Sequence, residues 1–165
     1  MAGGECAPVA ISRRISASAH DIFQLLADPG RHPDLDGSGM LRAGAVNAVV
    51  SAVGDVFVMK MHLPELGDYE MRNHVVEFEP DRRIGWEPAP GDAVSVAESG
   101  LPIGTPQGYR WSFELAPDGQ GATIVTEMFD CSRAAAEVRE AVHDGRDWVD
   151  SMTKTLETLD RLCAR

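Results

Sequence analysis

The stretch DLDGSG, residues 34–39, has residue types that could bind a calcium ion. Its side chains match positions 1, 3, 5 and 6 of an EF-hand loop, which here are Asp34, Asp36, Ser38 and Gly39. An EF-hand loop must close with a bidentate carboxylate at position 12, but that position is Ala45, and the cation Arg42 stands at position 9. We therefore predict no calcium site and interpret the stretch as a glycine-rich turn.

The five histidines do not form a recognisable catalytic or metal-binding motif; they are His20, His32, His62, His74 and His143. His32 is followed by Pro33 in a turn-rich stretch, which favours a structural role over metal binding. The sequence contains no G-x-S-x-G or H-E-x-x-H motif and no glycine-rich phosphate loop. In the stretch ATIVTEMFD, Glu127 is predicted to face outward, and no acidic partner for acid–base catalysis is evident. We therefore assign no catalytic residue.

The three cysteines, Cys6, Cys131 and Cys163, are far apart in the sequence. An odd number without C-x-x-C spacing predicts neither a disulfide framework nor a structural zinc site. We expect no metal and no cofactor.

Composition predicts an ordinary globular domain. The chain has 165 residues, of which 44% are hydrophobic and 25% charged, so we expect a single domain over residues 1–165. Its net charge of −11 disfavours nucleic acid and anionic membrane surfaces as partners. The N-terminus MAGGECAPVA lacks the pattern of a signal peptide, and no apolar run approaches membrane-spanning length. We expect a cytoplasmic protein with no membrane partner, and the oligomeric state is left open, a homodimer included.

Helices are predicted near both ends of the chain. After a first strand at residues 8–16, Ser18 can cap a helix that Asp28-Pro29-Gly30 would end. Near the C-terminus, a spacing of four and three residues from Trp148 to Cys163 predicts an amphipathic helix of about 18 residues. The preceding stretch SRAAAEVREAV is also helix-like, with a break expected at Asp144-Gly145.

Between residues 40 and 132, alternating apolar and polar residues predict a meander of antiparallel strands. The clearest run is GYRWSFEL, and a further strand is expected in AGAVNAVVSAV. One connection, residues 90–108, is longer than a hairpin needs, and we predict that it forms a mobile lid.

Three stretches of this chain resemble the START-like, or SRPBCC, superfamily, with the polyketide cyclase/dehydrase-like group as the most similar. They are ISRRISASAHDIFQLLADPGRHPDLDGSG, VVEFEPDRRIGWEP and YRWSFEL followed by GATIVTEMFD. The resemblance covers essentially the whole chain and implies an α+β helix-grip fold. In that fold a curved antiparallel sheet of about seven strands wraps around a long C-terminal helix, and two short helices follow the first strand.

Such a fold leaves a cavity between sheet and helix, and strand alternation indicates its lining. The predicted lining residues are Phe57, Met59, Met61, Tyr69, Met71, Asn73, Trp86, Tyr109, Trp111, Phe113 and Met128, with Trp148 and Met152 from the last helix. Five of the seven methionines fall in this set, and methionine is common at adaptable binding surfaces, whereas a closed core favours Leu, Ile and Val. Asn73 could orient a ligand carbonyl or hydroxyl, or it could bond to Tyr109 or a trapped water.

The resemblance implies a protein that binds a small, largely apolar molecule that is polyketide-, aromatic- or lipid-like. If the protein is an enzyme, the family suggests cyclisation or dehydration by positioning of the substrate. The alternative is a non-catalytic carrier or ligand sensor. A co-chaperone-like interaction module ranks last, because the predicted outer face of the sheet is charged.

Overall fold

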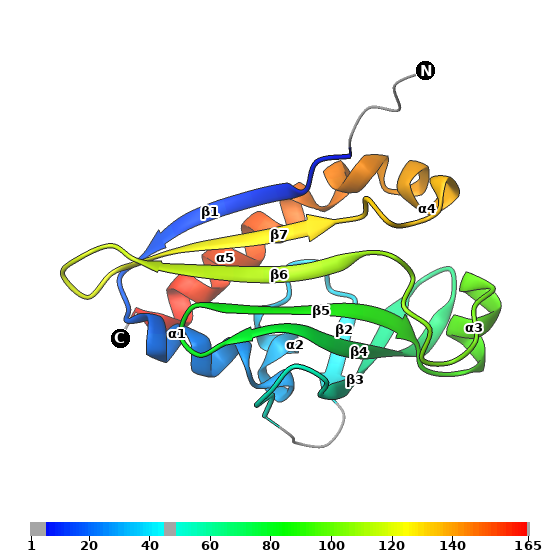
Figure 1. Ribbon diagram of the computed structural model, residues 1–165, viewed down its shortest axis with the longest axis horizontal. Coiled ribbons are helices and arrows are strands. Elements are labelled where there is room, and N and C mark those ends of the chain that lie inside the picture. Colours follow the sequence, from blue (N-terminus) through cyan, green and yellow to red (C-terminus); the bar gives the residue numbers. More distant parts are fainter. Residues whose placement is uncertain (1–5, 45–48, 165) are drawn as a thin grey trace.

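The central feature of the computed structural model, which describes residues 6–44 and 49–164, is one seven-stranded antiparallel sheet (Figure 1). In chain order the strands are β1 (Val9–Ile15), β2 (Leu41–Gly44), β3 (Val56–Leu63), β4 (Gly67–Glu79), β5 (Arg83–Pro90), β6 (Arg110–Pro117) and β7 (Thr123–Asp130). Their spatial order is β1-β7-β6-β5-β4-β3-β2, so the first strand pairs with the last.

A long C-terminal helix crosses one face of this sheet, which we call the inner face (Figure 1). The helices are α1 (Ala19–Leu26), α2 (His32–Leu35), α3 (Ala93–Ser99), α4 (Ala136–Ala141) and α5 (Val149–Cys163), with 3-10 segments η1 (Pro29–Arg31) and η2 (His143–Trp148). The predicted α+β class is confirmed: a curved antiparallel sheet, a long C-terminal helix and short helices after the first strand.

Local side-chain chemistry sets the ends of α1. Ser18 Oγ accepts a hydrogen bond from the Asp21 backbone N–H at 3.1 Å, which satisfies a donor that a helix start leaves unpaired. Beyond the helix, Asp28 Oδ1 accepts from the Gly30 N–H at 3.0 Å and begins η1. The predicted start and stop of this helix are confirmed.

The C-terminal helix is shorter than the apolar spacing indicates. Helix α5 has 15 residues and is preceded by the 3-10 segment η2, in which Asp144 and Gly145 have left-handed φ angles of 54° and 92°. The predicted break is therefore confirmed. Residues Met152, Thr155, Leu156 and Leu159 form the buried stripe of α5.

The larger cluster of buried apolar side chains includes the end of the sheet where α1 meets the C-terminal half of α5 (Figure 1). Ile22, Ile84, Val125, Leu156 and Leu159 are all buried there. Removing such side chains from water is the main force that stabilises the fold. The other end of the inner face is lined by larger aromatic and methionine side chains.

The strand expected in AGAVNAVVSAV is only partly present. Strand β2 ends at Gly44, residues 45–48 lie outside the described residues, and residues 49–55 are irregular. The Val50 N–H donates to the Ala27 carbonyl at 2.7 Å, and the Val50 side chain is buried. The apolar residues here therefore pack a loop onto the core. Apolar periodicity alone cannot distinguish such a loop from a strand.

The sequence implied that the long connection at residues 90–108 is irregular throughout, but part of it is helical. It contains α3, which begins with a capping box in which Asp92 Oδ1 accepts from the Ser95 N–H at 2.9 Å. Ser95 Oγ also donates to the Glu70 carbonyl at 2.9 Å, which ties α3 to β4.

Among the described helices, none combines the length and the apolarity needed to cross a membrane.

Candidate ligand-binding site

A cavity of about 940 Å³ lies between the inner face of the sheet and helices α2, α3, α4 and α5. Small-molecule sites usually occupy about 300–1,000 Å³, so this volume suits a ligand of drug or metabolite size. Leu35 from α2, Glu98 from α3, Val138 from α4 and Met152 from α5 line it opposite the strands.

The structure places every predicted lining residue around this cavity except Met128. Most of these side chains come from β3, β4, β5 and β6, and Tyr109 directly precedes β6. Trp148, at the end of η2, and Met152, in the first turn of α5, also line the cavity. The role of these residues in binding stays a prediction.

Met128 and Glu127 were assigned to the wrong faces of β7. Glu127 pairs with Phe113, and Met128 pairs with Ser112; directly paired residues share a face, so Glu127 points inward with Phe113. Glu127 lines the cavity and is 6% exposed. The stretch ATIVTEMFD has apolar residues on both faces, so its own alternation does not identify the inner one; pairing with β6 does.

The Glu127 carboxyl group is buried, and one of its oxygens lacks a hydrogen bond that would offset the loss of hydration. Its Oε2 atom has no hydrogen-bond partner among the residues that the structure describes. Burial raises the pKa of Glu127 to about 8, and the negative charge of Asp36 adds to the effect. At neutral pH the carboxyl group is therefore protonated in the main, and it can donate a hydrogen bond to a ligand as well as accept one.

Trp148 presents a second unpaired polar atom in the cavity wall. Its Nε1 is buried and has no acceptor among the described residues. The ring packs edge-on against Trp111 at a centroid distance of 5.8 Å, and Trp111 lies 4.6 Å from Phe129. Because Phe129 follows Glu127 by two positions on the same face of β7, both unpaired groups border this aromatic cluster.

His32 also lines the cavity, a position that sequence reasoning did not predict. Its ring stacks on Trp86 with centroids 5.1 Å apart, and its Nε2 donates to the Leu26 carbonyl at 2.7 Å. Burial lowers the pKa of His32, although its bond to Leu26 and the Asp28 and Asp36 carboxylates partly oppose this shift. This hydrogen bond fits the expected structural role. The lowered pKa means that the imidazole lining the cavity is neutral.

Two tyrosines add neutral hydroxyl groups. Burial raises the pKa of Tyr69 to about 12, with a contribution from the Glu98 carboxylate. Burial likewise raises the pKa of Tyr109 well above its usual range. Both phenols stay protonated at neutral pH and can serve as hydrogen-bond donors to a ligand.

Among the described residues, Asn73 hydrogen-bonds to a backbone carbonyl and not to Tyr109. Its Nδ2 donates to the Phe57 carbonyl on the neighbouring strand, at a long 3.5 Å. The side chain is 5% exposed and lines the cavity. A contact of this length is weak, so the amide keeps most of its capacity to bond with a ligand.

The connection at residues 90–108 borders the cavity through Ser95, Glu98, Ser99, Leu101 and Gln107. It is therefore placed where a lid would be, between strands β5 and β6. Its mobility stays a prediction.

No family model matches the chain. Uncharacterized protein Rv0088 of Mycobacterium tuberculosis is 31% identical over 134 residues, which cover 80% of this chain and 52% of that protein. The chain thus spans about half the length of the curated relatives it matches.

Two solved structures are similar to this chain along nearly its full length. Protein Ms6760 from Mycobacterium smegmatis matches with a TM-score of 0.66 and 16% identity, over 94% of this chain and 89% of that one. Protein CV1439 from Chromobacterium violaceum matches with a TM-score of 0.64 and 19% identity, over 96% and 97%. At these identities the likeness shows the fold alone, and it is compatible with the predicted helix-grip fold.

Proposed function

We propose that the protein is a cytoplasmic, single-domain member of the START-like superfamily that binds a small, largely apolar molecule in its cavity. The observation that carries this proposal is the 940 Å³ cavity with aromatic and methionine walls and one buried, unpaired carboxyl group, that of Glu127. Apolar walls with a few placed polar groups are the usual composition of a small-molecule site.

The ligand should carry at least one oxygen-bearing group. Glu127 Oε2 and Trp148 Nε1 are both buried without a partner in the described part of the chain, and such atoms are costly unless a ligand or water bonds to them. Polyketide-like and aromatic metabolites with carbonyl or hydroxyl groups fit this combination. A purely hydrocarbon ligand would leave both atoms unpaired.

If the protein is an enzyme, Glu127 is the residue that could supply a proton. Dehydration and aldol-type cyclisation both need a proton donor, and an acid with a pKa of about 8 is protonated at neutral pH. The alternative is a carrier or sensor, for which Glu127 would only orient the ligand. Native mass spectrometry separates the two when a co-purified molecule is returned to the protein and its mass is followed for conversion.

The co-chaperone-like alternative still ranks last. The outer face carries an ion-pair network in which Arg110 Nη1 lies 3.2 Å from Glu77 and its Nη2 lies 3.0 Å from Glu87. Arg83 joins the same network through Glu77 and Glu114. A charged surface of this kind offers little apolar area to a protein partner.

Replacement of Trp111 tests the proposed binding function. Trp111 is only partly buried and lines the cavity, so Trp111→Ala should destabilise the protein by about 1–2 kcal/mol, less than the ~3–5 kcal/mol typical of a closed core. The neutral probe N-phenyl-1-naphthylamine should bind the wild type saturably and quench tryptophan emission. The variant should fold and lose this binding.

Ile84→Ala is the matched control. Ile84 is 0% exposed in the closed part of the core, so its loss should cost about 2–5 kcal/mol and leave probe binding intact. The proposal fails if the wild type binds the probe without saturation, or if Trp111→Ala binds it as tightly as the wild type does.

A further inference from the structure

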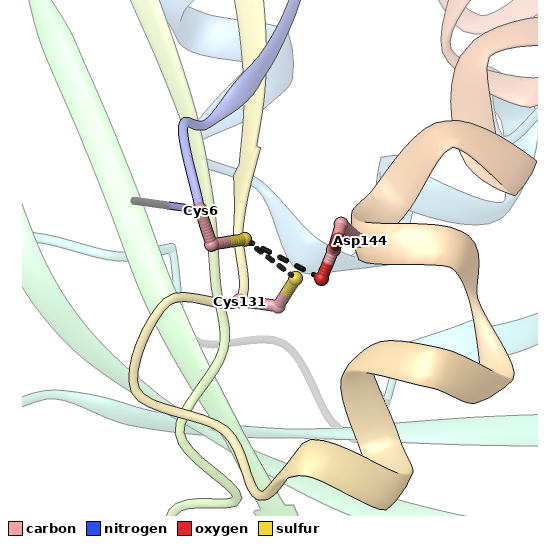
Figure 2. A group of neighbouring side chains, drawn as sticks. All are labelled: Cys6, Cys131 and Asp144. Atoms are coloured by element: carbon pink, nitrogen blue, oxygen red, sulfur yellow. Dashed lines mark hydrogen bonds between the residues drawn. The ribbon is translucent and has the colours of Figure 1, made fainter. Parts of the chain in front are cut away.

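Three side chains that are distant in the sequence meet at one end of the β1–β7 pair, outside the cavity (Figure 2). Cys6 precedes β1, Cys131 follows β7, and Asp144 belongs to the break before α5. Figure 2 shows both sulfur atoms and the Asp144 carboxylate pointing toward one another. The Cys6 Sγ lies 3.7 Å from the Cys131 Sγ and 3.7 Å from Asp144 Oδ1, and all three atoms lie within 4.8 Å of one another.

We propose that Cys6, Cys131 and Asp144 bind a zinc ion or a similar borderline-soft divalent cation. This inference does not depend on what the cavity binds. It departs from the prediction of no metal, which rested on sequence spacing alone. Pairing of the first and last strands brings Cys6 and Cys131 together.

The spacing of the donor atoms fits tetrahedral zinc. Zinc–sulfur bonds of about 2.3 Å at the tetrahedral angle place two sulfurs about 3.8 Å apart, and a sulfur and a carboxylate oxygen about 3.5 Å apart. The Cys6–Cys131 sulfur pair and the Cys6–Asp144 sulfur–oxygen pair, each at 3.7 Å, are close to these values, and the Cys131 Sγ lies within 4.8 Å of the Asp144 carboxylate. Three protein ligands would leave the fourth position to water.

The charges around the three ligands also suit a divalent cation. Two thiolates and one carboxylate around a doubly charged ion leave one net negative charge. Arg139 donates from Nε to Asp144 Oδ1 at 3.2 Å, so its guanidinium group balances that charge and orients the carboxylate. A carboxylate ligand favours zinc over copper(I), which prefers sulfur alone.

The backbone near Asp144 is held in an unusual conformation. His143 and Asp144 have φ angles of 50° and 54°, in the left-handed region that residues other than glycine rarely occupy. Two such residues in succession persist only where the surroundings hold them in place, and they are enriched at functional sites. Here they accompany a carboxylate directed at two sulfurs.

A metal at this position would fasten one wall of the cavity. Helix α4 lies between Cys131 and Asp144 in the chain, and residues of this helix, including Glu137 and Val138, line the cavity. A metal bound by residues that precede and follow α4 in the chain would join that wall to the sheet. We therefore expect a bound metal to stabilise this wall of the cavity.

Metal titration of the full chain under anaerobic, reducing conditions tests the proposal. The wild type, first treated with a chelator, should bind one zinc ion per chain with a sub-micromolar dissociation constant and unfold at a higher temperature. Cobalt should give the sulfur-to-metal charge-transfer absorption of a thiolate site. Asp144→Asn, which keeps the side-chain size and tolerates the left-handed backbone, should weaken zinc binding by at least about tenfold.

Cys131→Ser and Cys163→Ser form the matched pair. Cys131→Ser should abolish the cobalt charge-transfer absorption, whereas Cys163→Ser removes a remote thiol on α5 and should change neither the absorption nor the zinc affinity. The proposal is overturned if the wild type binds zinc only at high micromolar concentration or if Cys131→Ser binds it as the wild type does. It is also overturned if Cys6 and Cys131 form a disulfide in freshly purified protein and the reduced chain takes up no metal.

Discussion

At the scale of single residues, Glu127 is a buried carboxyl group that could bond to a ligand. A carboxyl group enclosed by aromatic and methionine side chains loses its hydration, and here it gains no hydrogen bond for Oε2 among the described residues. A ligand that offers this atom a partner would recover part of the lost free energy. The same residue can therefore contribute to ligand affinity while it lowers the stability of the free protein.

Glu127→Gln should change how stability depends on pH. The folded-state pKa of about 8 lies above the ordinary value of 4.5, so the folded protein holds a proton that the unfolded chain releases between these two pH values. Stability of the wild type should therefore fall as pH rises from about 5 to about 8, by a few kcal/mol at most. Glutamine does not titrate, so the variant should lack this fall.

Urea unfolding at several pH values between these limits measures the effect. Glu157→Gln is the control, because Glu157 lies exposed on α5 and should leave the pH profile of the wild type unchanged. Parallel profiles for wild type and Glu127→Gln would contradict the buried, protonated state of this carboxyl group.

At the scale of secondary structure, sequence reasoning predicted the elements whose signals are local. Ser18, Asp28 and the Asp144-Gly145 pair mark helix ends through capping and backbone preference, and they were found where expected. Features that depend on tertiary pairing were missed. Glu127 was placed outward because only its pairing with Phe113 fixes the face of β7, and the apolar run at residues 49–55 packs as a loop.

Gly145 tests how closely the break before α5 packs on the sheet. A Cβ atom at this position would lie 2.6 Å from Phe129 Cδ1, and the φ of 92° is already unfavourable for any other residue. Gly145→Ala should therefore destabilise the protein by about 3 kcal/mol or more, from strain and overpacking together.

Gly119→Ala separates these two contributions. Gly119 also has a positive φ, 62°, but a Cβ there would meet nothing within 4 Å. This control should cost only about 1 kcal/mol, from backbone strain alone. Equal losses for the two variants in thermal or urea unfolding would show that packing against Phe129 contributes nothing.

At the scale of the whole molecule, the inner face of the sheet divides into a closed end and a hollow end. The closed end holds Ile22, Ile84 and Leu159, all with no exposure. The hollow end holds the cavity, and the short helices α3 and α4 cover part of it. Neither α3 nor α4 has a buried apolar side chain. Such elements have low local stability, so the two ends should open independently of each other.

Hydrogen exchange can resolve this division and the predicted lid together. Backbone amides of β7, α1 and the second half of α5 should exchange slowest, whereas α3, α4 and residues 100–108 should exchange fastest among the described elements. Saturation with N-phenyl-1-naphthylamine should slow exchange at α3, α4 and residues 100–108 and leave the closed end unchanged, because a ligand stabilises the segments that enclose it. Trp111→Ala, tested at the same probe concentration, should show no such slowing. Uniform exchange rates along the chain, or slowing at the closed end instead, would mean that residues 90–108 are no lid and that the probe binds elsewhere.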